Sequence, residues 1–335
     1  METIYFLGID ISKKKFNLAL TLDAKNFYEE EAENNAKGIQ ALFIDLKKRF
    51  SFNFSQLIVC MEHTGIYCQP LLDFLVKKEI KVCVEPALRI KQSQGMQRGK
   101  NDQVDAKRIA SYAFKNYSEL TFWKPQRIIL QRLKALLATR ERLIKVKVQL
   151  QVPLNECADF VEKTVRDAIL IHCTKPIRSI EQSILKIEEA ITNLMGEDQA
   201  ISNQVKLATS VPGVGKITAL HVILATGEFN LIREPKKFAC YSGVAPFEHS
   251  SGTSLRGRAR VSRMANMNMK KLLHLAAMSA IQCCEELRTF YKRKVDQGKN
   301  KMSVLNAVRN KLISRIFACI KNNRLYQNKY QHALV

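Results

Sequence analysis

Residues 3–31 have the sequence TIYFLGIDISKKKFNLALTLDAKNFYEEE, in which short apolar runs predict three β-strands in close succession. The first run covers residues 3–8, residues 15–22 alternate apolar and polar side chains, and residues 26–31 carry the glutamates typical of an exposed strand. Because only short connections separate these segments, we expect the three strands to form a meander.

The segments that follow alternate between helix and strand. Apolar residues at helical spacing predict helices over residues 37–49, 67–78 and 102–114, whereas continuous apolar runs at 56–62 and 80–85 predict buried strands. The order of three strands, helix, strand, helix, strand and helix resembles that of the ribonuclease H-like fold, an assignment by analogy. We therefore expect an α/β domain of ribonuclease H-like (RuvC-like) type at the N-terminus.

The rest of the sequence is expected to be mostly helical, which gives three domains in a chain of 335 residues. We expect the α/β domain at residues 1–120, a helical coiled-coil segment at 121–204 and a mostly helical C-terminal domain at 205–335. No low-complexity linker and no internal repeat is present in the sequence.

The middle segment has the apolar pattern of a coiled coil. One seam consists of Ile177, Ile180, Ile184, Ile187, Ile191 and Leu194, and a shorter one of Leu130, Leu133 and Leu137. Arg140 and Lys147 then stand where further apolar residues are expected. Pro153 and Pro176 are expected to interrupt the helical segment, which predicts a hairpin or paired helices instead of one rod. The seam either packs within one chain as a spacer or joins copies of the chain into a dimer or tetramer.

Four acidic residues lie at positions where this fold brings distant sequence together. Asp10 follows the first strand, Glu62 ends the fourth, and Asp102 and Asp105 lie three residues apart on one face of the last helix. In a ribonuclease H-like sheet the first and fourth strands are neighbours and the last helix packs across them. Singly, Asp102 could only cap its helix and Asp10 could only end its strand.

Together, the four carboxylates are expected to bind divalent metal. Buried like charges repel one another unless a cation lies between them. Hard oxygen ligands select Mg²⁺ or Mn²⁺, and two such ions about 3.5–4 Å apart stabilise both oxygens of a phosphoryl transfer.

The charge of the chain indicates a polyanionic partner. The net charge is +23, and from Gly252 to the C-terminus 18 Lys and Arg residues stand against three acids, which is about two thirds of the excess. This distribution favours nucleic acid over a cationic surface for solubility or for acidic lipid.

Composition argues against two other classes of protein. No apolar run approaches the roughly 20 residues that span a bilayer, and the N-terminus does not have the pattern of a cleaved signal peptide. The nine cysteines form no Cys-x-x-Cys pair, which argues against a zinc site and favours reduced thiols. We expect a cytoplasmic protein without a membrane partner.

Residues 212–218, PGVGKIT, superficially resemble a phosphate-binding loop. Ser210 stands where that loop requires its first glycine and Ile217 follows the lysine, so ATP binding is not expected. The segment is more similar to a helix-hairpin-helix turn, in which Gly213, Gly215 and Lys216 would approach a DNA phosphate. A purely structural turn between two helices is the alternative.

The N-terminal motifs resemble those of a known family. The segments GIDISKKKF, MEHTGIYCQPL and RGKNDQVDAKRIA are similar to the three acidic motifs of the DEDD transposases of bacterial insertion sequences, insertion-sequence family one-ten, whose relatives include the pilin-gene inverting recombinases. The resemblance implies that Asp10, Glu62, Asp102 and Asp105 bind the metal of a RuvC-like domain. Lys100 also matches the motif context and is a candidate contact to nucleic acid.

A second resemblance covers part of the C-terminal domain. The stretch ACYSGVAPFEHSSGTSLRGRARVSRMANMNMKKLL is similar to the second motif of the same family, which implies that Ser251 is a catalytic serine that forms a phosphoserine. From the residues alone, SSG predicts a flexible turn, and Ser250 is a rival nucleophile. The chain departs from the family at Ala265, where glycine is usual, and at Met269, where leucine is common.

Basic residues follow the serine. Arg256, Arg258, Arg260 and Arg263 are spaced mostly by two, which suits a strand or loop along a phosphate backbone, and the alternative is a solvated basic loop. Lys270 and Lys271 extend the basic stretch. The family resemblance further implies a structured non-coding guide RNA that pairs with donor and target DNA, so that base pairing selects the sequence.

The sequence therefore predicts a transposase that cuts and rejoins double-stranded DNA with Mg²⁺, a serine and a bridging RNA. A metal-dependent RuvC-like junction nuclease in which Ser251 is inert is the leading alternative. A nucleic-acid-binding scaffold without catalysis is the other.

Overall fold

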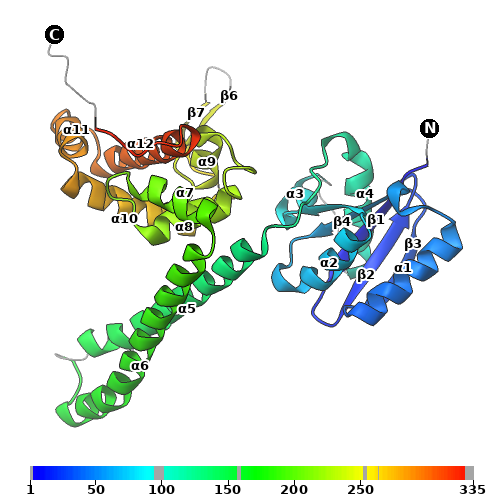
Figure 1. Ribbon diagram of the computed structural model, residues 1–335, viewed down its shortest axis with the longest axis horizontal. Helices are drawn as coiled ribbons and strands as arrows, with labels where there is room; N and C mark the ends of the chain where they lie inside the picture. Colours follow the sequence, from blue (N-terminus) through cyan, green and yellow to red (C-terminus); the bar gives the residue numbers. More distant parts are fainter. Residues whose placement is uncertain (1–2, 94–101, 157–159, 252–254, 263, 329–335) are drawn as a thin grey trace. The chain divides into compact units, whose positions relative to one another are not determined.

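The computed structural model divides the chain into two compact units, Met1–Pro125 and Gln126–Val335 (Figure 1). The described residues are 3–93, 102–156, 160–251, 255–262 and 264–328. The division at Pro125 lies close to the expected end of the α/β domain. The further division of the second unit into a hairpin and a C-terminal domain remains a prediction.

A five-stranded mixed sheet forms the centre of the first unit. The strands are β1 (Tyr5–Ile11), β2 (Lys15–Thr21), β3 (Tyr28–Glu33), β4 (Leu57–Glu62) and β5 (Lys81–Glu85). Their order is β3-β2-β1-β4-β5, in which β1, β2 and β3 pair antiparallel while β4 lies parallel to β1 and β5 parallel to β4. The expected meander and the expected neighbourhood of the first and fourth strands are both confirmed.

Helices cover both faces of this sheet. They are α1 (Ala36–Phe50), α2 (Gln69–Lys77), α3 (Ala87–Gln92) and α4 (Asp102–Lys115), with short 3-10 helices at Phe54–Gln56, Gly65–Cys68 and Tyr117–Glu119. Alternate residues of β1 face opposite sides: Leu7 and Ile9 pack with the core beneath α1 and α2, whereas Phe6 packs with Ile109 of α4. The sequence did not predict α3, because its six residues contain a single buried side chain, Ile90.

Gly8 allows α4 to lie against the sheet. A Cβ atom at this position would lie 2.2 Å from the backbone nitrogen of Ala110 and 2.3 Å from the carbonyl oxygen of Ala106. Both alanines are fully buried and pack with Ala19 of β2. The close approach of helix and strand therefore depends on the absence of a side chain at position 8.

The second unit consists of a long helical hairpin and a group of shorter elements. The hairpin is formed by α5 (Ile128–Glu156) and α6 (Lys163–Gly196). The shorter elements are α7 (Gln199–Thr209), α8 (Lys216–Thr226), α9 (Pro235–Tyr241), β6 (Phe247–Ser251), β7 (Leu255–Arg260), α10 (Met267–Cys283), α11 (Glu285–Asp296) and α12 (Lys301–Lys321). One apolar core continues from Leu130 and Ile191 at the base of the hairpin to Leu312 of α12. Among the described helices, none has both the length and the apolar character needed to cross a membrane.

The expected hairpin is confirmed, but the expected role of the prolines was wrong. Pro153 and Pro176 lie inside α5 and α6, and the chain reverses between Glu156 and Lys163 instead. A proline removes one backbone hydrogen bond. Helices in proteins are stabilised mostly by packing of an amphipathic face, so the packing of α5 against α6 outweighs this local loss.

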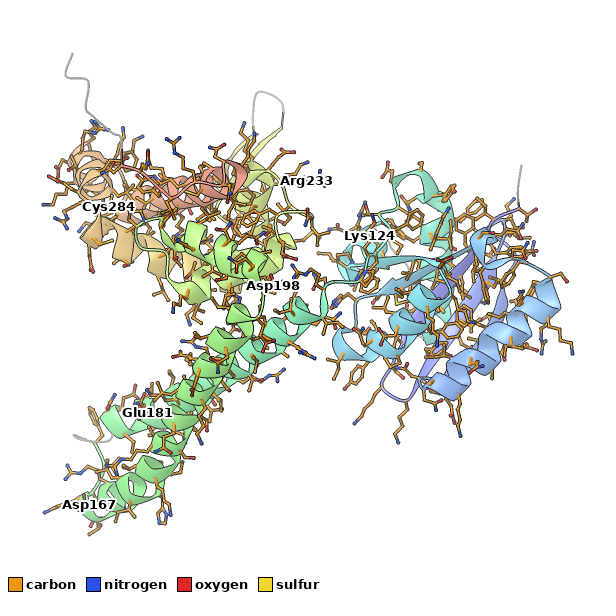
Figure 2. All side chains as sticks on the ribbon, in the orientation of Figure 1. Lys124, Asp167, Glu181, Asp198, Arg233 and Cys284 are labelled. Carbon is orange, nitrogen blue, oxygen red and sulfur yellow. The ribbon has the colours of Figure 1, made fainter. Side chains whose placement is uncertain are left out.

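The two basic residues that break the α5 seam have partners on α6. Arg140 Nε lies 2.7 Å from Glu188 Oε1, and Lys147 Nζ lies 2.7 Å from Glu181 Oε1. Glu181 is labelled in Figure 2. The two pairs are seven residues apart on each helix, so both fit one antiparallel register. A shift of the helices would separate both pairs, and we infer that they help to set the register of the hairpin.

A charge reversal at Arg140 tests this register. Arg140→Glu should lower the free energy of unfolding by about 1 kcal/mol, because a partly exposed ion pair is replaced by repulsion from Glu188. Adding Glu188→Arg should restore stability. Denaturant unfolding measures both effects, with Arg142→Glu as the control at an exposed position of the same helix. Equal losses in Arg140→Glu and Arg142→Glu would contradict the assignment.

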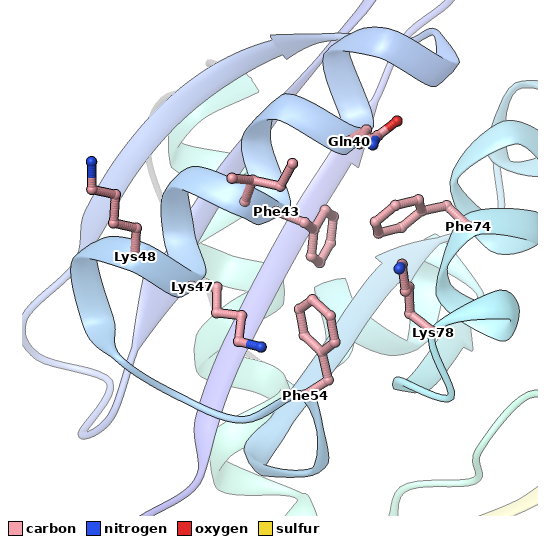
Figure 3. A pocket seen from close by; sticks show the side chains of 8 residues that line it. Gln40, Phe43, Lys47, Lys48, Phe54, Phe74 and Lys78 are labelled. Atoms are coloured by element: carbon pink, nitrogen blue, oxygen red, sulfur yellow. The ribbon is translucent and has the colours of Figure 1, made fainter.

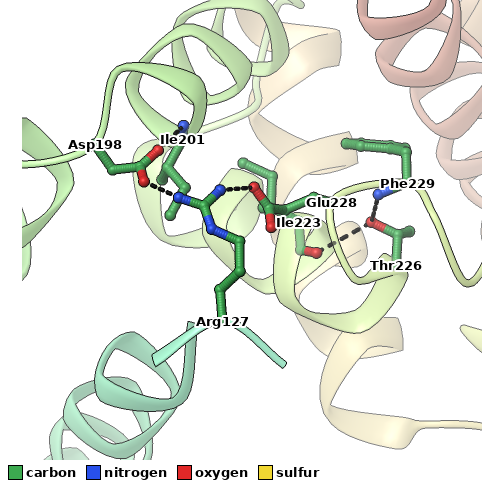
Figure 4. A network of polar contacts seen from close by, with 7 residues as sticks. All are labelled: Arg127, Asp198, Ile201, Ile223, Thr226, Glu228 and Phe229. Carbon is green, nitrogen blue, oxygen red and sulfur yellow. Dashed lines mark hydrogen bonds and ion pairs between the residues drawn. The ribbon is translucent and has the colours of Figure 1, made fainter. Parts of the chain in front are cut away.

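One arginine connects three elements at the base of the hairpin (Figure 4). The guanidinium of Arg127, just before α5, contacts the carboxylates of Asp198 and Glu228. Asp198 also caps α7, accepting a hydrogen bond of 2.9 Å from the backbone nitrogen of Ile201. Arg127 therefore links the start of α5, the start of α7 and the turn after α8.

Candidate active site

The pairing of β1 with β4 places two of the predicted acids side by side. The parallel register of the two strands ends with the pair Ile9 and Met61, and Asp10 and Glu62 are the next residues of their strands. Both residues are half-buried. Asp10 lies within β1, one residue before its end, whereas the sequence predicted that the strand would already have ended. Parallel strands in register direct paired residues to the same face, which here is the face covered by α4.

The direction of α4 brings the other two acids to the same end of the sheet. Phe6 contacts the ring of Phe114, near the end of α4, with ring centroids 5.4 Å apart. Gly8, further along β1, packs against Ala106, near the start of the helix. The helix therefore runs antiparallel to β1, and its first turns, which begin at Asp102, lie towards Asp10.

Asp105 already has a cationic partner in this structure. Arg108 Nη1 lies 2.8 Å from Asp105 Oδ1, and both side chains are about one-fifth exposed. Asp10 and Glu62 also have interaction partners. The side chain of Asp102 and all of Lys100 lie outside the described residues. Among the described side chains, no three His, Cys, Asp or Glu residues are grouped so as to hold a metal ion.

The chemistry of the donor set nevertheless fits a divalent cation. Asp10, Glu62 and Asp105 offer carboxylate oxygens from a strand, a second strand and a helix that meet at one edge of the sheet. Oxygen donors of this kind suit Mg²⁺ or Mn²⁺. The ion pair with Arg108 places a positive charge beside Asp105, as a bound cation would.

A fifth acid, which the sequence analysis missed, lies beside Glu62 in the sheet. The β4–β5 register pairs Glu62 with Glu85, whose side chain is only 4% exposed and accepts hydrogen bonds of 3.2 Å from Arg89 Nη1 at both oxygens. The charge of Glu85 raises the pKa of Arg89, and burial together with Glu85 raises the pKa of Tyr112 to about 12. Its signal in the sequence was its place at the end of a buried strand, the place that Glu62 has in β4.

The predicted serine lies at the end of a two-stranded ribbon in the second unit. Ser251 is the last residue of β6 and pairs with Leu255 of β7, while Ser250 pairs with Arg256. Arg258 and Arg260 continue β7, so the predicted extended conformation of this basic stretch is confirmed. Gly252 and Arg263 lie outside the described residues.

The chain returns from the ribbon to α10 through a tightly packed turn. Asn266 caps α10 by accepting a hydrogen bond of 2.9 Å from the backbone nitrogen of Met269, and its amide donates to the hydroxyl of Tyr241 at 2.8 Å. Gly243 has φ +65°, and a Cβ there would lie 3.0 Å from that of Ala265. Ala265 is therefore accommodated next to a glycine. The candidate nucleic-acid contacts Lys270 and Lys271 lie in the first turns of α10, where Lys271 is exposed.

A buried arginine that the sequence analysis also missed supports the segment before the ribbon. Arg309 of α12 is 5% exposed and donates to Asn306 at 3.2 Å, while its other amino group lies 2.7 Å from the Nδ1 atom of His274. Asn306 in turn donates to the carbonyl of Val244 at 2.7 Å. Burial lowers the pKa of both Arg309 and His274. An isolated arginine in a helix gives no sequence signal for such a role.

The PGVGK segment forms the turn between α7 and α8, as predicted. Gly213 has φ +81°, and a Cβ there would lie 2.4 Å from the carbonyl oxygen of Ala276 in α10, so packing alone requires glycine at this position. Gly215 caps α8, and both Gly215 and Lys216 are exposed. The exposed end of α8 is thus open to an anionic group, whereas Gly213 packs against a helix.

Comparison with known proteins gives matches to transposase families. One model, described as a DEDD transposase of IS110 type, matches residues 7–161, and another, described as the transposase IS116/IS110/IS902 family, matches residues 205–292. The pilin gene-inverting protein of Moraxella bovis is 26% identical over 329 residues, 97% of this chain and 98% of the relative. The transposase for insertion sequence element IS1111A of Coxiella burnetii is 26% identical over 203 residues, 52% of this chain and 53% of the relative.

Two solved structures also match about a third of the chain. RuvC of Thermus thermophilus covers 36% of this chain and 100% of its own, with 12% identity and a TM-score of 0.27. The same protein in complex with a Holliday junction substrate covers 36% of this chain and 99% of its own, with 12% identity and a TM-score of 0.28.

Proposed function

Since the chain belongs to the IS116/IS110/IS902 family of transposases, enzymes that cut and join DNA, we propose that it recombines double-stranded DNA by combining an acidic metal site with a serine nucleophile. The observation that carries the proposal is the placement of Asp10 beside Glu62 at the end of the sheet towards which the first turns of α4 lie. On this proposal, Asp102 and Asp105 would join Asp10 and Glu62 at that edge.

The four acids would hold Mg²⁺ or Mn²⁺ at this edge. Asp10 and Glu62 would contribute ligands from the sheet, and Asp102 and Asp105 from α4. When bound, the metal would stabilise negative charge on the oxygens of the phosphate that is cut. Arg108 would keep the carboxylate of Asp105 oriented through their ion pair.

Ser251 would supply the nucleophile. Its Oγ atom would lose its proton and attack the phosphorus of a phosphodiester, so that an Oγ–P bond forms while the bond from phosphorus to one deoxyribose oxygen breaks and that oxygen takes up a proton. In the second step, the hydroxyl of another strand would attack the phosphoserine, which restores the serine and joins the strands. The phosphoserine preserves the bond energy, so no high-energy cofactor is needed.

The basic residues would hold nucleic acid by its backbone. Lys216 with Gly215, the arginines of β7, and Lys270 with Lys271 are candidates for phosphate contacts, as is Lys100 of the first unit. A structured non-coding RNA would select the donor and target DNA by base pairing. The reaction would take place in the bacterial cytoplasm at the nucleoid.

A reconstituted reaction tests this function. The purified chain, RNA transcribed from the non-coding DNA that flanks its gene, and two plasmids carrying donor and target sites are expected to give joined DNA with Mg²⁺ and none with EDTA. Added Mg²⁺ should restore the product after EDTA treatment. If the same amount of joined DNA formed without RNA, the proposed guide RNA would be overturned. If joined DNA formed in EDTA, the proposed metal site would be overturned.

The leading alternative makes a different prediction for the same reaction. A metal-dependent junction nuclease would cut DNA in Mg²⁺ without leaving protein attached to the cut end. A scaffold without catalysis would bind DNA and leave it intact.

We also propose that α6 joins copies of the chain into a dimer or tetramer. The seam from Ile177 to Leu194 packs partly against α5, but Ile171 and Leu185 of α6 are 72% and 65% exposed. Leu185→Asp is expected to reduce the mass measured by light scattering, because a charge would enter the apolar contact. Gln182→Asp, which adds the same charge at an exposed position, is the control. An unchanged mass for Leu185→Asp would exclude this surface.

A further inference from the structure

The face of the first unit opposite α4 carries a pocket of about 490 Å³ between α1 and α2 (Figure 3). Its floor consists of Phe43, Phe54 and Phe74. Phe43 is fully buried, with ring centroids 5.0 Å from Phe74 and 6.5 Å from Phe54. Phe54 and Phe74 are only partly buried, so part of each ring remains open to solvent.

Every charged residue that lines the pocket is a lysine. Lys47 Nζ lies 5.3 Å from the ring centroid of Phe54, and Figure 3 shows the amino group of Lys78 beside the opening between Phe54 and Phe74. Within the described part of the chain, neither Lys47 nor Lys78 takes part in an ion pair. Aromatic rings between uncompensated cations match a ligand that combines a flat ring with negative charge.

We propose that this pocket binds one unpaired nucleotide of an RNA, with the base against Phe54 and Phe74 and the phosphates at Lys47 and Lys78. Aromatic floors with basic rims are the usual means of binding single-stranded nucleic acid. The amide of Gln40, which also lines the pocket, offers a donor and an acceptor to the base edge.

The energy needed to take a base out of a duplex favours an occupant whose base is already unpaired. Stacking on an aromatic ring stabilises a base by about as much as flipping it out of a duplex costs, so an open pocket gains little from a paired base. Loops of a structured RNA present bases that are already unstacked. This inference rests on the proposed use of an RNA, and adds the place where the first unit would contact it.

Photo-crosslinking with the full chain tests the pocket. The probe is a single-stranded RNA of ten nucleotides that contains one 5-iodouridine, and the crosslinked peptide is identified by mass spectrometry. We expect the wild-type chain to crosslink at Phe54 or Phe74. The variant Lys47→Gln/Lys78→Gln should reduce this yield at least fivefold, and Phe74→Leu should do the same by removing the flat ring.

Matched controls separate the pocket from general charge effects. Lys37→Gln/Lys77→Gln removes the same charge from exposed positions of α1 and α2 outside the pocket and should leave the yield unchanged. The lysine variants alter only exposed side chains, so they keep the test valid if Phe74→Leu is poorly folded.

Each contrary outcome points to a different error. Crosslinks confined to the second unit, or equal losses in both lysine variants, would overturn the pocket while leaving the use of RNA intact. Failure of the RNA to bind anywhere would overturn the proposed RNA partner as well. Equal crosslinking at the pocket by a DNA probe of the same sequence would overturn the assignment to RNA.

Discussion

Asp10→Asn is expected to lower the rate of DNA joining by about a thousandfold without destabilising the fold. Asparagine keeps the shape of the side chain but removes a charged oxygen ligand, which costs several kcal/mol of transition-state stabilisation at about 1.4 kcal/mol for each factor of ten. Because Asp10 lies beside Glu62, the loss of one negative charge relieves repulsion, so the melting temperature should stay the same or rise.

Quantification of joined plasmid DNA at saturating Mg²⁺ measures this effect, and thermal unfolding checks the fold. Asp73→Asn, which makes the same change at an exposed position of α2, is the control and should leave activity unchanged. Joining at more than one-tenth of the wild-type rate by Asp10→Asn would remove this residue from the proposed metal site.

Ser251→Ala is expected to abolish both the covalent protein-DNA adduct and strand exchange, because a methyl group cannot form a phosphoester. The adduct is detected as protein that remains on the cut DNA end after denaturation. Ser250→Ala, the neighbouring residue on β6, should retain both activities to a large extent. The two variants together therefore distinguish the rival nucleophiles.

Continued cutting by Ser251→Ala would have a clear meaning. If this variant still nicked DNA in Mg²⁺ and no adduct formed with the wild-type chain, metal-activated water would be the nucleophile. The chain would then act as the junction nuclease of the alternative, and Ser251 would only end a strand.

The architecture of the first unit was largely predictable because its signals are local. Alternating apolar and polar residues and continuous apolar runs predicted the strands. The order of the elements predicted that β1 and β4 are neighbours. The position of Asp10 and Glu62 at the same end of neighbouring strands follows from that order. Glu85 ends a buried strand as Glu62 does, but its ion pair with Arg89 and its pairing with Glu62 became clear only from the structure.

Features that depend on distant partners could not be predicted. Arg140 interrupted an apolar seam in the sequence, and its meaning became clear only from Glu188, which is 48 residues away. The prolines of the hairpin illustrate the opposite error, since a local rule predicted breaks that packing between α5 and α6 overrides. Gly213 was assigned to nucleic acid from its motif, and the structure adds a packing reason that lies in α10.

The close contact at Gly8 makes the geometry of the candidate metal site depend on a residue that has no functional group of its own. Asp10 and Glu62 belong to strands and Asp105 to α4, and the absence of a side chain at Gly8 allows the close spacing between β1 and this helix. Gly8→Ala would add a methyl group that pushes α4, and Asp105 with it, away from β1 and Asp10. All four carboxylates would still be present in the chain. A related sequence can therefore encode an inactive enzyme although it retains all four acids. The presence of the four acids in a sequence is not sufficient evidence of activity.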